Sequence, residues 1–217
     1  MTSPRPLVER KQRQARARII EAAQELFRDR GFDGVSVGDI AERAEVGRTT
    51  FFRHFGDKQE VVFAKEQELL ETITAASRAD DIAAARNVTE AIEQLRPILL
   101  TICTRAAADP EGYTRHFQLI AQHPELRDRD AAKVQQIADK LGDLLVNRGS
   151  DEPTARFAAH IAIACYQTVK RLGNNPHTLV DDIRAALEQV LTLGTEPQAE
   201  PPDPSRGIHT AGRGGPA

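Results

Sequence analysis

Apolar residues recur along this chain at helical spacing, in segments separated by short polar, glycine-containing or proline-containing breaks. The first segment covers residues 9–30, and Gly31 supplies the residue that commonly ends a helix. Its apolar residues share one helix face: Ile19, Ala22, Ala23, Leu26 and Phe27. The alternation of apolar and polar positions that is typical of strands is hard to find. The pattern therefore predicts an all-α protein.

Caps, prolines and glycines divide the rest of the chain into further expected helices. With the first segment they make about nine, over residues 37–44, 48–55, 57–77, 87–107, 109–122, 124–147, 151–172 and 178–193. The helix over 57–77 is expected to run without interruption from one domain into the next. Pro97 lies inside the helix over 87–107, so a kink or break is expected near Arg96.

Residues 36–58, SVGDIAERAEVGRTTFFRHFGDK, combine two short helices with a tight turn. Ser36 and Asp39 have the spacing of a capping box at a helix start. The chain turns through residues 45–47, and Asp57 can cap the helix that follows. A helix, a turn of about four residues and a second helix form the geometry that places a recognition helix in the DNA major groove.

Charge is distributed unevenly around the net charge of −3. Residues 1–65 hold 13 Lys and Arg against 10 Asp and Glu, a net +3, whereas the remaining residues hold 16 against 22, a net −6. An acidic body with a basic N-terminal end is typical of a protein that presents only that end to a polyanion. A solvated helix face would give the same charge pattern.

Several other classes of protein find little support. No apolar run approaches the roughly 18 residues that span a bilayer, and no signal peptide is recognisable, so a cytoplasmic protein without membrane contact is expected. Cys103 and Cys165 lie in expected amphipathic helices and are interpreted as buried free thiols. The six histidines show no metal-ligand spacing, and no cofactor is expected.

Motifs for catalysis are absent as well: the sequence has no phosphate-binding glycine loop, no GxSxG, no HExxH and no credible triad. An enzyme is therefore not expected. Two alternatives remain open, a helical enzyme with scattered catalytic residues and a helical adaptor without sequence-specific DNA binding.

Residues 19–37, IIEAAQELFRDRGFDGVSV, and 38–58, GDIAERAEVGRTTFFRHFGDK, resemble the N-terminal domain of the TetR family of bacterial transcriptional regulators. The resemblance implies a helix-turn-helix DNA-binding domain over residues 9–56 and a helical ligand-binding and dimerisation domain over 57–194. Residues 1–8 are interpreted as a flexible arm and 195–217 as a disordered tail. The stretch over 113–133 is similar to a subgroup of the family that includes regulators responding to fatty acyl-CoA and to mycofactocin-linked metabolism.

The implied function is that of a homodimeric repressor, which a small hydrophobic, acyl-CoA-like effector releases from a palindromic double-stranded DNA operator. The residues that the resemblance places on DNA are Ser36, Arg48, Thr49, Thr50, Phe52, Arg53, His54 and Lys58. Two positions depart from the family pattern. Phe52 replaces the usual Tyr and has no hydroxyl for a phosphate, and Gly38 replaces a frequent Arg or Lys.

The C-terminal residues receive two expected roles. The effector is expected to lie among the helices over 57–172, against Leu69, Ile73, Leu99, Ile102, Arg105, His116, Phe117, Ile120, Leu141, Leu145 and Tyr166. Two copies of the chain are expected to meet through the last two helices, at Ala155, Ala158, Ala159, Ala162, Leu187, Val190 and Leu191.

Overall fold

The structure is a computed structural model that describes residues 5–64, 69–70, 73–75 and 82–193. Within these residues the fold is all-α, as the periodicity predicts. The helices are α1 (Arg5–Arg30), α2 (Val37–Arg43), α3 (Arg48–His54), α4 (Lys58–Val62), α6 (Val88–Ala107), α7 (Pro110–Gln122), α8 (Pro124–Asn147), α9 (Glu152–Leu172) and α10 (Leu179–Leu193). The expected tail over 195–217 and residues 1–4 of the expected arm lie outside the described part.

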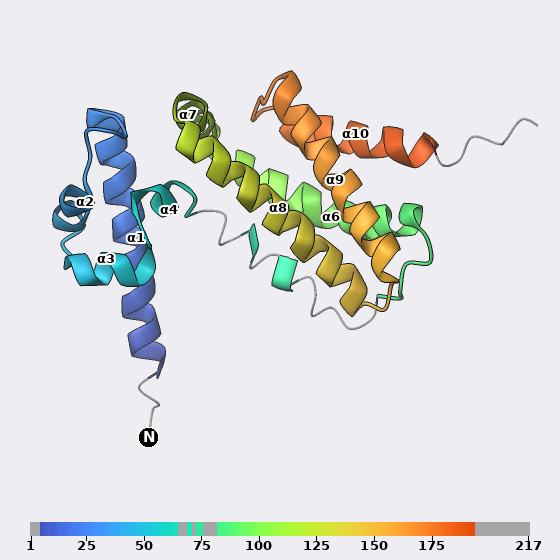
Figure 1. The fold of residues 1–217 in the computed structure, drawn as a ribbon, viewed down its shortest axis with the longest axis horizontal. Helices are drawn as coiled ribbons and strands as arrows, with labels where there is room; N and C mark the ends of the chain where they lie inside the picture. The colour runs from blue at the N-terminus through green and yellow to red at the C-terminus, as the bar shows by residue number, and fades with distance from the viewer. Residues whose placement is uncertain (1–4, 65–68, 71–72, 76–81, 194–217) are drawn as a thin grey trace, which may run out of the picture.

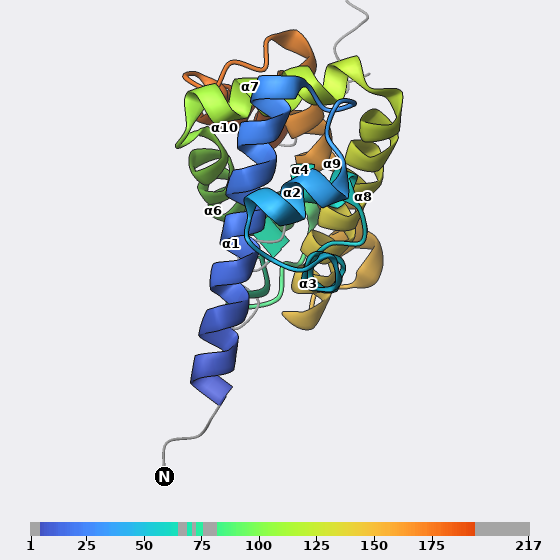
Figure 2. The same ribbon diagram turned by 90° about the vertical axis from the view of Figure 1, so that its left-hand side faces the viewer.

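Two bodies are visible in Figure 1, one built from α1–α4 and the other from α6–α10. We call the first the head. Each has its own apolar core. Figure 2 shows α1 in front of the C-terminal helices, with its end beside α7. Helix α1 begins at Arg5, four residues earlier than the sequence pattern indicates, and Pro6 falls in its first turn, where a proline is tolerated.

The helix-turn-helix forms as its caps predict. The Ser36 Oγ accepts a hydrogen bond from the Asp39 amide at 3.2 Å, and the Asp39 carboxylate accepts one from the Ser36 amide at 2.8 Å. Helix α2 closes through a bond of 2.9 Å from the Val46 amide to the Ala41 carbonyl. Glu45 sits in the left-handed region, with φ of 51°, a conformation that favours glycine at a helix end. The turn therefore directs α3 away from α2.

The expectation of one continuous helix over residues 57–77 is wrong. Helix α4 ends at Val62, and Phe63 and Ala64 form a turn. The Ala64 carbonyl accepts a hydrogen bond of 2.7 Å from the Arg16 guanidinium of α1, so a side chain from the other end of the head satisfies a backbone group at this helix end. Phe63 is 2% exposed. Phe63 is thus buried within the turn that ends α4.

We call the contact between the head and the α7–α8 region the seam. Its apolar part contains Phe32, Phe63, Ile120 and Leu126. Its polar part is formed by Arg129 of α8, whose guanidinium donates to both carboxylate oxygens of Asp57 at 3.0 Å each and to Glu60 at 2.8 Å. Lys133 donates to the second oxygen of Glu60 at 3.1 Å. The seam thus joins α4 directly to α8.

The C-terminal body packs α6, α8, α9 and α10 around one core. Helix α6 runs through Pro97 without the break expected near Arg96. Apolar side chains before and after the proline, Leu95 and Leu99 among them, are buried in the same core. Continuous packing along that face maintains the helix despite the hydrogen bond that proline cannot donate.

The expected dimer contacts on α9 are wrong for this arrangement. The four alanines, Ala155, Ala158, Ala159 and Ala162, and Leu187 of α10 are all 0% exposed inside one protomer. Small side chains let α9 approach α6 and α8 of its own chain closely. The alanine face of α9 is therefore covered within the protomer and is not open to a second copy of the chain. Val190 and Leu191 are partly buried against the same core.

Candidate functional site

The outward face of α3 carries most of the residues that were assigned to DNA. Arg48, Thr49 and Arg53 are exposed, and Phe52 is 53% exposed, an unusual environment for a phenylalanine. Thr50 is half-buried. The inward face anchors the helix with Phe51 and Phe55, which are 0% and 5% exposed. The structure thus brings these side chains together on one accessible helix surface.

Gly38 and Arg48 are in close contact across the turn. A Cβ placed on Gly38 would lie 2.6 Å from Nη2 of Arg48 and 3.3 Å from Ser36 Oγ. The Arg48 guanidinium therefore lies over the first turn of α2, in space that only a glycine leaves free. The missing side chain at position 38 thus determines where the arginine of α3 lies.

Two of the predicted DNA residues have partners within the head. The Ser36 hydroxyl donates to the Asp39 carboxylate, and these hydrogen bonds hold the pKa of Asp39 below its usual value. The Lys58 ammonium donates to the Phe32 carbonyl at 2.9 Å and to the Val35 carbonyl at 3.1 Å. It also lies 4.3 Å from the centre of the Phe32 ring. The expectation that Lys58 presents its ammonium to a phosphate is therefore corrected: the side chain ties α4 to the loop before α2.

His54 lies at the end of α3 and is half-buried. Burial lowers the pKa of its imidazole, and the positive charges of Arg53 and Arg16 lower it further. The ring is therefore neutral near pH 7, unless a negative charge approaches it.

A large cavity of about 630 Å³ opens between the head and the C-terminal body. Its inner wall is aliphatic and comes from α6, α8 and α9. Eight of the predicted effector residues line it: Leu69, Leu99, Ile102, Arg105, His116, Phe117, Leu141 and Tyr166. The other three do not. Ile120 packs in the seam, and Ile73 and Leu145 are core residues, 1% and 0% exposed.

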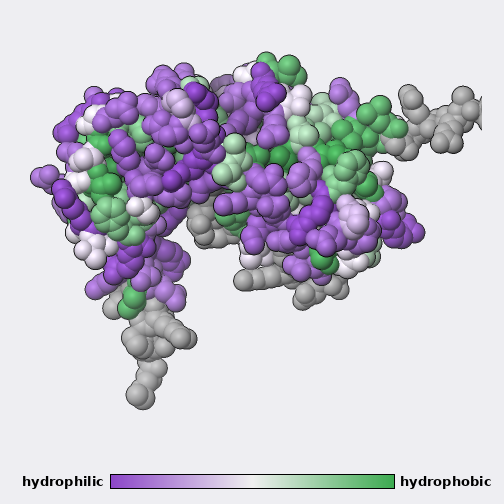
Figure 3. All heavy atoms as spheres, viewed as in Figure 1, coloured by the Kyte–Doolittle hydropathy of each residue, from purple (hydrophilic) through white to green (hydrophobic). Residues whose placement is uncertain are grey.

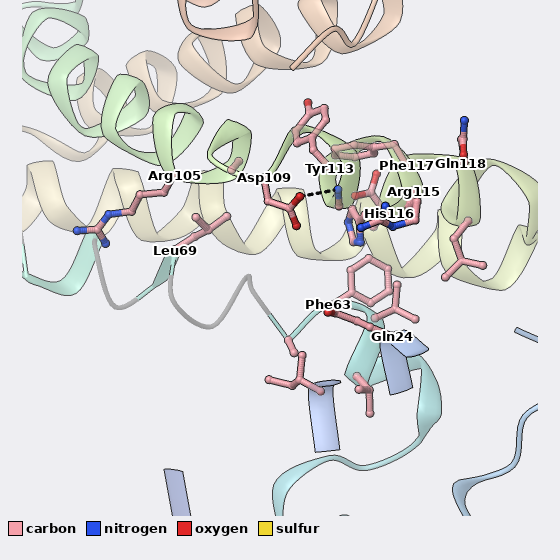
Figure 4. A pocket seen from close by; sticks show the side chains of 18 of the residues that line it. Gln24, Phe63, Leu69, Arg105, Asp109, Tyr113, Arg115, His116, Phe117 and Gln118 are labelled. Carbon is pink, nitrogen blue, oxygen red and sulfur yellow. Dashed lines mark hydrogen bonds between the residues drawn. The ribbon is translucent and has the colours of Figure 1, made fainter. Parts of the chain in front are cut away.

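The head supplies a wall of this cavity that the sequence pattern did not reveal. Gln24 and Phe27 of α1 and residues 61–64 line it. Figure 4 shows Phe63 next to His116 of α7, and the two rings meet edge-on with their centres 5.8 Å apart. The helical spacing of apolar residues in α1 indicates which face of the helix is buried, but not which part of the other body lies against it. No sequence signal could therefore have placed these residues in the cavity wall.

Two lining residues of the cavity, Tyr113 and Asp130, have polar partners behind its wall. Lys170 of α9 pairs with Asp130 of α8 at 3.1 Å, and its ammonium lies 4.2 Å from the centre of the Phe117 ring. The Tyr113 hydroxyl donates to the Asn174 side chain at 2.6 Å. Cys103 is buried in the wall, and burial raises the pKa of its thiol to about 12. Lys170 with Asp130, and Tyr113 with Asn174, thus form pairs within the C-terminal body.

One group of potential metal ligands occurs among the described residues. Asp33, His123 and Glu125 bring one ligand atom each within 4.8 Å of one another. Sequence spacing missed the group because Asp33 lies far from the other two along the chain. Asp33 and Glu125 are exposed, where water solvates carboxylates without a metal, so the group does not define a metal centre.

Outward-facing apolar side chains on α9 form a second stripe, opposite the buried alanines. Phe157 and Leu172 are 61% and 83% exposed, Ala164 is exposed and Ile161 is half-buried. In Figure 3 apolar side chains gather at the end of the molecule where α9 and α10 lie. We call Phe157, Ile161, Ala164 and Leu172 the α9 stripe. Exposed apolar side chains that share one helix face indicate an interaction surface.

An exposed recognition helix on a small helical head, attached to a helical body with a cavity, defines a helix-turn-helix transcriptional regulator. Comparison with known proteins agrees: residues 19–64 match the family of bacterial regulatory proteins described as the tetR family. Residues 19–64 are thus a DNA-binding domain of the TetR family. Within the described residues, no helix is both long enough and apolar enough to cross a bilayer.

Similarity to individual regulators extends beyond the head. The chain is 26% identical to the regulator TcmR of Streptomyces glaucescens over 76% of this chain and 74% of that protein. It is 31% identical to TtgR of Pseudomonas putida over 57% and 56% of the two chains. The structure of FadR from Thermus thermophilus, a TetR-family repressor solved with lauroyl-CoA, superimposes with a TM-score of 0.55 at 22% identity, covering 87% and 98% of the chains. The similarity to FadR shows the shared fold.

The contact between Gly38 and Arg48 gives a testable prediction. Gly38→Ala should raise the free energy of unfolding by about 0.5–1 kcal/mol, because alanine favours a helix over glycine. The same change should lower affinity for a selected DNA site about threefold to tenfold, because the new methyl group displaces the Arg48 guanidinium. Urea unfolding and fluorescence anisotropy measure the two effects.

The control is the same substitution in an Arg48→Ala background. There Gly38→Ala should leave DNA affinity within about 1.5-fold, since the side chain that it displaces is gone. An equal loss of affinity in both backgrounds would contradict the role assigned to Gly38.

Proposed function

We propose that the protein is a homodimeric repressor that a small amphipathic ligand releases from a palindromic DNA operator. The observation that supports this most strongly is the shared cavity. Residues of α1 and of the turn after α4 line the same space as residues of α6–α9. A ligand in this space touches the head and the body together.

On the DNA side, we assign base and phosphate contacts to the exposed face of α3. Arg48 and Arg53 carry the guanidinium groups that pair with guanine edges or phosphates. Thr49 and Thr50 offer hydroxyls, and the exposed ring of Phe52 offers an apolar surface to a thymine methyl group. Ser36 and Lys58 act indirectly, by starting α2 and by holding α4. His54 contributes at the edge of the face.

On the ligand side, we assign an aliphatic chain with a polar head group. The inner wall offers Leu99, Ile102 and Leu141, whereas the rim carries Arg105 and Arg115 of α6 and α7. A long apolar group bearing an anionic end matches both parts. The lauroyl-CoA held by the structurally similar FadR has this chemistry, and an acyl-CoA thioester is therefore the first ligand to test.

Release from DNA then follows from linkage. A ligand lowers operator affinity only if it binds more tightly to a head position that does not match the operator. Phe27 and Phe63 belong to the head and line the cavity, so a ligand that contacts them can change the position of the head. The turn after α4 means that the head moves about the seam, and not at the end of a long rigid helix.

The ligand proposal predicts release of DNA. A site selected from random duplexes by the full-length protein should be bound with nanomolar affinity, and a saturating long-chain acyl-CoA should weaken that binding about tenfold to a hundredfold. Anisotropy titrations measure both constants. Ile102→Trp, which fills the aliphatic wall, should retain DNA binding and lose the response.

The matched control is Val146→Trp, because Val146 of α8 is exposed and does not line the cavity. It should respond like the parent protein. If the selection yields no preferred duplex, the proposed role as a DNA-binding regulator is wrong. If a specific duplex is found but acyl-CoA does not release it from either the parent protein or Ile102→Trp, only the ligand assignment is wrong.

We place the dimer contact on the α9 stripe, since the small residues that were first assigned to it are used inside the protomer. Phe157→Asp should convert a dimer into a monomer, because it buries a charge at the centre of an apolar contact. Sedimentation equilibrium should show the dissociation constant rising at least about tenfold. Val146→Asp, an exposed apolar residue on α8, is the control and should leave the dimer intact. A monomeric parent protein, or an unaffected Phe157→Asp dimer, would contradict this surface.

A further inference from the structure

A second cavity, of about 420 Å³, lies at the seam beneath the end of α3. Its character differs from that of the effector cavity, because much of its wall is polar. Four structural elements supply the polar side chains: Arg16 from α1, Arg53 and His54 from α3, Glu60 from α4, and Lys133 from α8. The cavity therefore connects the recognition helix to the C-terminal body through charged groups.

Positive charge exceeds negative charge among the described residues of this wall. Arg16 donates to the Ala64 carbonyl at 2.7 Å and lies 5.2 Å from the centre of the Phe55 ring. Arg53 contacts the Thr50 hydroxyl at 3.4 Å. Neither guanidinium is paired with a carboxylate of the described residues. Glu60 is the acidic group of the wall, and it is already held by Lys133 and by Arg129.

His54 independently indicates what this cavity binds. Its Nε2 atom is buried and has no hydrogen-bond partner among the described residues. A buried polar nitrogen without a partner costs free energy. Burial, and after it the positive charges of Arg53 and Arg16, lower the pKa of the imidazole, so a proton on the ring would add to a group of side chains that is already positive. A bound anion would accept a hydrogen bond from Nε2 of the protonated ring and would balance the positive charges of the two arginines.

We propose that the seam cavity is a binding site for a small oxyanion of the phosphate type, separate from the effector cavity. Arg16, Arg53 and His54 supply donors from the head, and Lys133 supplies one from α8. An anion held between them connects the head to the body and occupies Arg53. If the proposed DNA-binding function holds, the anion therefore competes with the operator for that arginine.

Binding is tested on the full-length protein without DNA. Isothermal titration with inorganic phosphate, at an ionic strength held constant with sodium chloride, should give a dissociation constant of about 1 mM or tighter. Lys133→Gln and Arg16→Gln should each weaken phosphate binding at least about fivefold. Lys140→Gln is the matched control on α8, because Lys140 is exposed, lies outside the cavity and has its nearest acidic partner at 3.8 Å.

The charge state of His54 supplies a second readout. Because the pKa of His54 is lowered in the anion-free protein, the ring is neutral near pH 7, and a neighbouring anion should raise its pKa and draw a proton onto it. Imidazole ¹⁵N spectra recorded across pH 5–8 should show this rise with phosphate. His177, which is exposed between α9 and α10 and lies outside the cavity, serves as the internal reference.

Two results would overturn the proposal. The first is a heat of titration that sodium chloride reproduces at equal ionic strength. The second is phosphate affinity that stays unchanged in Lys133→Gln, a variant whose folding a thermal unfolding curve verifies. Since these measurements contain no DNA, a negative result there leaves the regulator proposal standing.

Discussion

The contact of Arg129 with Asp57 and Glu60 is the interaction on which the arrangement of the two bodies depends. Asp57 also caps α4 by accepting a hydrogen bond of 2.8 Å from the Glu60 amide, so one carboxylate both starts the helix and binds α8. The carboxylates are 46% and 36% exposed, and pairs that open to solvent add little to stability. The contribution of this contact is geometric: bidentate bonds fix the direction of α4 relative to α8.

The apolar seam and the Lys58 ammonium extend the same constraint into the head. Phe32 packs against Phe63 and Leu126, while its carbonyl accepts a hydrogen bond from Lys58 at the start of α4. The loop before α2 is thereby coupled to the helix that touches the body. Since both cavities border this seam, a ligand in either one acts on a junction that already determines where α3 points.

Local sequence signals predicted most of the helices and the helix-turn-helix, because capping residues and prolines act within a few positions. The failures come from contacts between distant positions. Helix α4 ends where Arg16 reaches the Ala64 carbonyl, 48 residues away, and Lys58 finds carbonyls 23 and 26 residues away. Helix α9 carries small or apolar residues on two faces. Periodicity locates both faces but does not indicate which one the protomer buries, so it could not place Phe157 on the surface and the alanines in the core. The head wall of the effector cavity was missed for a similar reason, since it depends on how the two bodies meet.

In the proposed function, an effector acts on the head directly, through the shared cavity. Hydrogen–deuterium exchange of the full-length protein, with and without an acyl-CoA that releases the operator, tests this. The ligand should change exchange at residues 20–28 of α1 and 57–64 around α4, together with residues 99–122 of α6 and α7. Changes confined to α6–α10, with the head amides unaffected, would contradict it.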